Sequence, residues 1–141
     1  MPVNLSLDPN LALVVFEYSG SVTMEDIIQA EKQLHDPQDV QRYNKQLDIY
    51  HTDVEINWNL DDYFHYRSKL GILIGYPSKL RVAVVTKSSF LFGIHRMFDI
   101  ENKIIRVYAD HMTFYALDEA CDWLNMPRDI IQERFQHQIS K

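Results

Sequence analysis

The hydrophobic and polar positions of this chain follow two different periods, which separate strands from helices. At the start, Val3, Leu5 and Leu7 alternate with polar residues, which is the period of a half-buried strand. Asp8-Pro9-Asn10 supplies the residues of a turn, and the β-rich run Leu11–Tyr18 follows it. The pattern therefore predicts that the chain opens with an antiparallel hairpin.

A first helix is predicted directly after the hairpin. Thr23-Met24-Glu25-Asp26 has the form of a capping box, in which a hydroxyl caps the helix and an acid lies three residues further on. Apolar residues then recur at helical spacing, and Asp36-Pro37 is expected to end the helix. These apolar residues are Met24, Ile27, Ile28 and Leu34.

A short strand and a second helix come next. Leu47, Ile49 and His51 alternate with their neighbours as in a strand. Asn59 is expected to begin the second helix, because the acidic pair Asp61-Asp62 is favourable in a first turn. The expected inner face of this helix consists of Leu60, Phe64 and Leu70.

A central strand and a third helix occupy the middle of the chain. Gly75-Tyr76-Pro77-Ser78 is a predicted loop, and the almost entirely apolar run Leu80–Val85 fits a strand that is covered on both faces. Ser88 or Ser89 is then positioned to cap a third helix.

The stretch after this helix start has two interpretations. Propensity favours a strand at Ile104–Tyr108, whereas periodicity extends the third helix through it. We predict the long helix, followed by a turn at Asp110-His111 and a strand at Met112–Tyr115. The shared apolar face of the long helix would be Ile94, Met97, Phe98, Ile104, Ile105 and Tyr108.

Two more helices complete the chain. The fourth has an inner face and ends at Asn125, and Pro127 fits the first turn of a tail helix. The inner face is Leu117, Ala120, Cys121 and Leu124, and the stripe on the tail helix is Ile131, Phe135 and Ile139. The order β-β-α-β-α-β-α-β-α, plus the tail helix, predicts an α/β fold with a mainly parallel sheet. We assign residues 1–125 to this domain and residues 126–141 to the C-terminal amphipathic helix.

Composition narrows the function classes. The 141 residues fit one domain, and the net charge of −6 argues against nucleic acid, which needs a Lys/Arg surface. No apolar run approaches the ~20 residues of a membrane span, and no signal-peptide pattern opens the chain. Cys121 is the one cysteine. It excludes an internal disulfide, lies on an apolar helix face as a small hydrophobe, and fits a reducing, cytoplasmic location.

Three motifs occur in a characteristic order. Tyr18–Thr23 has the pattern strand, Ser-Gly-x-Val-Thr, helix. The strand Arg81–Val85 is followed by Phe92–Phe98, with the pattern Phe-Gly-x-x-Arg-Met-aromatic, and Leu117–Leu124 contains Glu-Ala-x-x-Trp-Leu. Together these motifs resemble those of the SpoIIAA-like proteins, small bacterial-type relatives of STAS domains. The resemblance covers roughly Val3–Asn125 and implies the SpoIIAA-like (STAS) fold.

The resemblance also carries functional implications. STAS domains are known as partner-switching modules, controlled by phosphorylation of a Ser or Thr that follows an Asp at the second helix. The matching region Asp53–Asp62 has no Asp-Ser or Asp-Thr pair, and Thr52 precedes it, so this phosphoswitch is not expected here. The fold also resembles the lipid-binding SEC14 domain, which makes a small apolar ligand conceivable.

The most informative local chemistry is Thr86-Lys87-Ser88-Ser89, which joins a central strand to a helix. Open α/β sheets bind ligands beyond the carboxyl ends of their strands, and helix N-termini favour anions. The alternative is ordinary helix capping by a serine. The candidate ligand-binding residues are Lys87, Ser88, Ser89, Arg96 and His51.

Other polar groups have simpler explanations. The Asp61-Asp62 pair with His65 lacks the further ligands of a metal site, and an exposed helix face explains it. Asp48, His51 and Asp53 have the residue types for acid–base catalysis, and a loop network explains them equally well. We therefore expect no catalytic residue, metal or cofactor.

Three functions remain open. The first is a non-enzymatic regulatory or protein-interaction module, the second a binder of a small apolar or anionic ligand near the third helix, and the third an enzyme. An aromatic-lined pocket would favour the second, and a flat exposed apolar patch the first. The aromatic residues concerned are Tyr63, Phe64, Tyr66, Phe90, Phe92 and Phe98. The tail helix is expected to cap its own domain or to form a homodimer.

Overall fold

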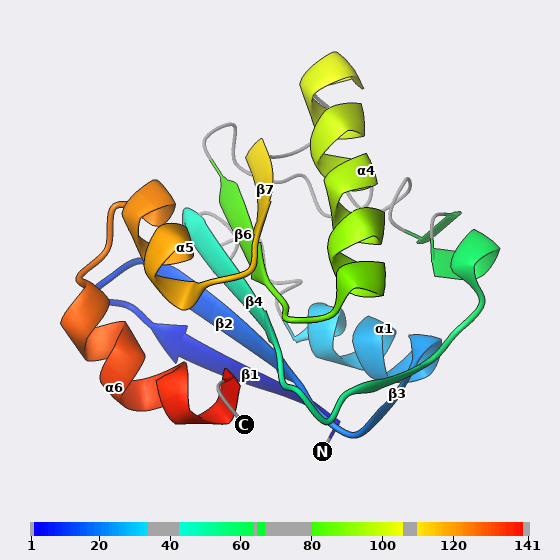
Figure 1. Ribbon diagram of the computed structural model, residues 1–141, viewed down its shortest axis with the longest axis horizontal. Helices are drawn as coiled ribbons and strands as arrows, with labels where there is room; N and C mark the ends of the chain where they lie inside the picture. Colours follow the sequence, from blue (N-terminus) through cyan, green and yellow to red (C-terminus); the bar gives the residue numbers. More distant parts are fainter. Residues whose placement is uncertain (1, 34–42, 64, 67–79, 106–109, 140–141) are drawn as a thin grey trace.

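A five-stranded sheet with helices on both faces forms the protein (Figure 1). The computed structural model describes residues 2–33, 43–63, 65–66, 80–105 and 110–139. The strand order is β1-β2-β4-β6-β7, in which only the β1–β2 pair is antiparallel. The strands are β1 (Val3–Asp8), β2 (Leu13–Tyr18), β4 (Lys45–Tyr50), β6 (Arg81–Val85) and β7 (Asp110–Phe114). The predicted α/β architecture, mainly parallel with an opening hairpin, is confirmed.

The hairpin turn follows from its local chemistry. Asp8 Oδ1 accepts a hydrogen bond from the backbone N–H of Leu11 at 3.2 Å, an interaction typical of aspartate in turns. Ala12 has a φ of 52°, which lies in the left-handed region. The turn sets the register, so that Asp8 pairs with Leu13 and Val3 with Tyr18.

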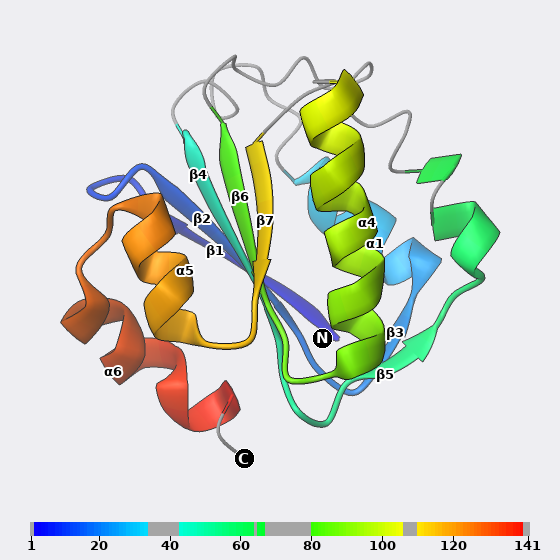
Figure 2. The ribbon, with the colours of Figure 1, turned by 45° about the horizontal axis from the view of Figure 1, so that its top comes forward.

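The alternation of side chains divides the core into two clusters, one on each face of the sheet. One cluster contains Val14, Phe16, Val82 and Val84 and is covered by α1 (Met24–Lys32) and α4 (Ser89–Ile105). The other contains Leu13, Val15, Ala83 and Val85 and is covered by α5 (Leu117–Leu124) and α6 (Arg128–Ile139). Figure 2 shows α1 and α4 together on one side of the sheet and α5 and α6 on the other.

The capping box of the first helix forms as predicted. The Thr23 side chain accepts from the backbone N–H of Asp26, and the Asp26 carboxylate accepts from the backbone N–H of Thr23. Before it, β3 (Ser21–Thr23) pairs in parallel with β5 (Glu55–Asn57) in a separate two-stranded sheet, which the sequence did not reveal. The predicted helix end at Asp36-Pro37 lies outside the described residues, and α1 itself ends at Lys32.

The short helical segment after β5 differs from its prediction. Asn59 caps it, because its side chain accepts from the backbone N–H of Asp61 at 2.8 Å. Among its described residues Tyr63 is buried, whereas Leu60, predicted on the inner face, is exposed. Tyr63 stacks on Trp58 at 4.3 Å between ring centroids, and this aromatic pair fixes the inner side of the segment. Phe64, Leu70 and the loop Gly75-Tyr76-Pro77-Ser78 lie outside the described residues.

The long third helix is confirmed as far as Ile105, the last described residue of α4. The turn predicted at Asp110-His111 is wrong, because both residues belong to β7. The face predicted for α4 is also partly wrong: Ile94 is buried, but Met97 is 56% exposed. Tyr108 lies outside the described residues, as do the side chains of Phe98, Ile104 and Ile105.

The last two helices pack on the same chain. The four predicted inner residues of α5 are all buried, and Asn125 ends the helix in the left-handed conformation with a φ of 58°. In α6, Ile131 is fully buried in the α5 cluster, and Arg134 pairs with Asp8 at 3.4 Å. Ile131 is therefore covered by this chain's own domain. The side chains of Phe135 and Ile139 are not among those that the structure describes. No helix among the described residues is long and apolar enough to cross a membrane.

The burial of Ile131 generates a stability prediction. Ile131→Ala should lower the free energy of unfolding by about 3 kcal/mol, because it removes buried methyl groups and leaves a cavity. The exposed neighbour Glu133→Ala is the control, with an expected change below about 0.5 kcal/mol. Urea unfolding measures both. Equal stabilities for the two variants would show that α6 does not pack on the domain.

Candidate functional site

A pocket opens at the carboxyl edge of the sheet, where the segments after β4 and β6 meet. Its volume is about 450 Å³. Its lining is His51, Thr52, Val54, Ile56, Thr86, Lys87, Ser88, Phe90 and Leu91. The structure thus brings three candidate ligand-binding residues, His51, Lys87 and Ser88, to one pocket.

Ser88 is the residue that caps α4, which decides between the two predicted serines. Its Oγ accepts from the backbone N–H of Leu91 at 3.3 Å, and its own N–H donates to Thr86 Oγ1 at 3.1 Å. Thr86 is buried, and its N–H donates to the Phe114 carbonyl at 3.1 Å. Ser89 is exposed and is absent from the pocket lining. The strand-to-helix joint is therefore fixed by hydroxyl hydrogen bonds.

Lys87 supplies the positive charge at the pocket. Its side chain is exposed, and within the described part of the chain it has no carboxylate within ion-pair distance. The first N–H groups of a helix and its dipole add to this positive potential. Lysine, a serine hydroxyl and a helix N-terminus together favour a carboxylate or a phosphate.

His51 also lines the pocket. Its hydrogen-bond partner is Glu17, which was not part of the acid–base group predicted from the sequence. Its Nε2 is 3.1 Å from Glu17 Oε1, and both side chains are largely buried. Asp48 instead accepts from the Gln46 amide at 2.9 Å on β4, and Asp53 is exposed in the following turn. The described hydrogen bonds of His51 and Asp48 therefore go to Glu17 and Gln46.

Arg96, the remaining candidate, is directed away from the pocket. Its Nη1 donates to Asp99 at 3.4 Å and to Met112 Sδ at 3.5 Å, towards β7. Asp61, Asp62 and His65 are all exposed, and the described residues contain no group of three His, Cys, Asp or Glu side chains arranged for a metal. Neither arrangement contributes to the pocket.

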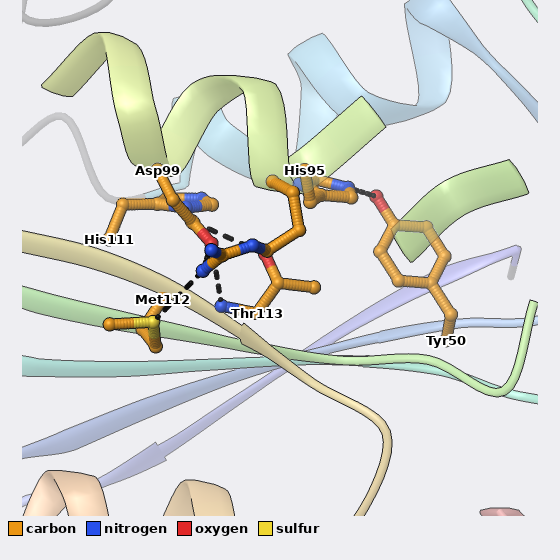
Figure 3. A network of polar contacts seen from close by, with 7 residues as sticks. Tyr50, His95, Asp99, His111, Met112 and Thr113 are labelled. Atoms are coloured by element: carbon orange, nitrogen blue, oxygen red, sulfur yellow. Dashed lines mark hydrogen bonds and ion pairs between the residues drawn. The ribbon is translucent and has the colours of Figure 1, made fainter. Parts of the chain in front are cut away.

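A buried polar cluster under α4 was missed by the sequence analysis (Figure 3). Asp99, with an exposure of 0%, accepts from the backbone N–H of Thr113 at 3.0 Å and from its hydroxyl at 3.3 Å. The same carboxylate is hydrogen-bonded to Nδ1 of His111. Next to it, His95 Nε2 is 3.0 Å from the Tyr50 hydroxyl, and the His95 and His111 rings stack at 5.8 Å. Two spacings in the sequence could have indicated the cluster. His95 and Asp99 are four residues apart, so they share one face of a helix, and His111 and Thr113 are two apart, so they share one face of a strand.

The cluster continues along the same face of β2 and β4. Tyr18 stacks on Tyr50 with ring centroids 4.4 Å apart. Burial raises the pKa of Tyr18 well above its ordinary value, and the nearby carboxylate of Asp48 adds to the effect. Burying so many polar groups is tolerated only where they are hydrogen-bonded, so this cluster ties α4 to one position over the sheet.

Known proteins resemble this chain in fold. No protein-family model matches it, and no curated protein matches it. A solved structure is similar to it: an uncharacterised DUF3478-family protein with a SpoIIAA-like fold from Shewanella loihica PV-4. The TM-score is 0.52 and the identity 16%, over 86% of this chain and 91% of that one. The chain therefore has a SpoIIAA-like fold, as its sequence motifs imply.

The hydrogen bonds of Asp99 generate the next prediction. Asp99→Asn should lower the free energy of unfolding by about 3 kcal/mol. The NH₂ group of asparagine would replace one of the oxygens that now accept hydrogen bonds, so a donor would face donors. Asp110→Asn, at an exposed position on β7, is the matched control and should change stability by less than about 0.5 kcal/mol. Chemical denaturation measures both variants. A loss at Asp99 no larger than at Asp110 would contradict the assigned hydrogen bonds.

Cys121 provides a separate test of burial. Burial raises the pKa of its thiol to about 11, and the charge of Asp118 adds to the shift. At pH 8 about one thiol in a thousand is then ionised, and the thiolate is the reactive form. The native protein should therefore react with a disulfide reagent at least 100-fold more slowly than the urea-unfolded protein, a rough bound from the same ionisation argument. Equal rates would place Cys121 at the surface.

Proposed function

We propose that this chain is a non-enzymatic binding module whose pocket takes a small amphipathic molecule with an anionic head group. The observation that carries the proposal is the composition of the pocket lining. The lining combines Lys87, Ser88 and the start of α4, which are polar or positive, with the apolar side chains of Val54, Ile56 and Leu91. Small-molecule sites in proteins combine an apolar lining with a few convergent polar groups in this way.

The net charge of the chain limits where an anionic ligand can bind. The chain carries a net charge of −6, so an anion is repelled by most of its surface. Lys87 is the lysine that lines the pocket, and His51, which also lines it, is already paired with Glu17. A single anionic group against Lys87 and the helix N-terminus, with an apolar chain along Val54 and Ile56, satisfies both kinds of lining residue. A multiply charged ligand would lack further cations.

The proposal includes no STAS-type phosphoswitch. Thr52, the hydroxyl residue nearest the expected position, lies in a turn that leads into β5 and not at the start of a helix. The role we infer is thus binding without covalent control, in the reducing cytoplasm that the buried thiol of Cys121 suits.

Three probes test the pocket: octyl phosphate, octanol and inorganic phosphate. Octyl phosphate should bind most tightly, because it contacts both kinds of lining residue, and it should shift the amide resonances of residues 51–56 and 86–91. Lys87→Met should weaken octyl phosphate about fivefold, which is the ~1 kcal/mol of an exposed ion pair, and leave octanol unchanged. NMR titration reports both the affinity and the location.

The control is Lys32→Met, which removes another exposed lysine, at the end of α1. The proposal is wrong if octyl phosphate binds no better than octanol, or if the two lysine variants lose the same affinity. Shifts confined to other parts of the chain would also contradict it.

A further inference from the structure

Several apolar side chains are exposed on the described part of α4, on the face that points away from the sheet. They include Phe90, Met97 and Ile100, with exposures of 62%, 56% and 53%. Gly93 is exposed between them, and the four positions recur every three or four residues along one side of the helix. We refer to these four residues as the outer stripe. Exposed apolar side chains at this spacing are unusual on the solvent face of a helix.

Gly93 is the least expected member of the outer stripe. Glycine within a helix is destabilising relative to alanine. A Cβ added at Gly93 would meet no atom within 4 Å, and its φ is not in the left-handed region, so neither packing nor conformation requires glycine here. An exposed helical glycine flanked by large apolar side chains does allow another backbone to approach closely.

One flank of the outer stripe is acidic. The stretch Gln46–Tyr66 contains five acidic residues and neither lysine nor arginine. Its residues Thr52, Val54 and Ile56 share the pocket with Phe90, and Tyr63 lies with its ring 6.2 Å from that of His95 on α4. In both ribbon views β5 and the short helical turn after it lie on the same side of α4 (Figure 2). The exposed acids of this stretch are Asp53, Glu55, Asp61 and Asp62.

A second copy of the chain fits this face poorly. The outer stripe spans residues 90–100, or roughly 15 Å of helix, whereas a stable interface buries about 800 Å² on each partner. Two copies would also bring together two chains of net charge −6. On α4 itself Arg96 is already paired with Asp99, and Lys87 lies before its first turn, at the pocket. A short segment with positive charge is the complementary occupant.

We propose that the outer stripe docks a basic amphipathic helix of another protein. The apolar side of that helix packs on Met97 and Ile100, and its backbone comes closest at Gly93. Its lysine or arginine residues face the acids of the 53–62 stretch. This mode is helix-on-helix recognition, with apolar anchors three or four residues apart and charge setting the orientation.

The probe is a synthetic amphipathic peptide of about five helical turns, ~18 residues, with leucine on one face and lysine on the other. A second peptide carries glutamate in place of lysine. The lysine peptide should bind at least tenfold more tightly than the glutamate peptide, and its amide shifts should lie along α4. Gly93→Ala should weaken this binding at least fivefold, yet raise the melting temperature by about 3 °C through better helix propensity.

These opposite effects at Gly93 separate docking from folding. Asp53→Asn with Glu55→Gln should also weaken the lysine peptide, whereas the control pair Glu119→Gln with Glu133→Gln, exposed on α5 and α6, should not. The proposal is overturned if both peptides bind equally, or if Gly93→Ala leaves the affinity unchanged. A wild-type dimer in sedimentation that Gly93→Ala dissociates would instead assign the face to a second copy. Binding to phosphatidylserine vesicles that Met97→Gln abolishes would assign it to a membrane surface.

Discussion

The arrangement of this protein depends on one buried carboxylate at the edge of its sheet. β7 is an edge strand, and its pairing with β6 leaves the N–H of Thr113 directed outward, where it donates to Asp99. An unpaired edge invites association with other strands, and an unsatisfied buried carboxylate is costly. The hydrogen bond gives the Thr113 N–H an acceptor and the Asp99 carboxylate a donor. Together with His111 and the Thr113 hydroxyl, the contact fixes how far α4 slides along the sheet and how it is rotated.

The rotation of α4 has two consequences for function. His95 and Asp99 take positions on the inner face of the helix, so Met97 and Ile100 remain on the outer face, and the usual amphipathic order is partly inverted. The same rotation sets the start of α4 over the carboxyl edge of the sheet, with Lys87 and Ser88 beside the segment after β4. One helix thus presents a pocket at its first turn and an apolar stripe along its length. Phe90 belongs to both.

Much of the fold could be predicted from the sequence because its signals are local. Thr23 and Asp26 form a capping box, Asn125 ends α5, and the apolar run at β6 requires burial on both faces. The position of Lys87 and Ser88 at a strand-to-helix joint was likewise sufficient to place them at the pocket. The errors arose where a tertiary contact overrides the local pattern. His111 resembles a turn residue until Asp99 pairs with it, and Met97 resembles a core residue until the polar cluster rotates it outward. The pairing of β3 with β5 joins residues more than thirty positions apart, and no periodicity reports such contacts.

The most direct test of this account is the hydrogen-exchange rate of the Thr113 amide in the native protein. If Asp99 covers the edge of β7 and fixes α4, this amide should exchange only through global unfolding, as slowly as the amides of the interior strand β6. A Thr113 amide that exchanges at the rate of an open edge strand, while β6 remains protected, would contradict the account. It would mean that α4 is not fixed over the sheet by Asp99.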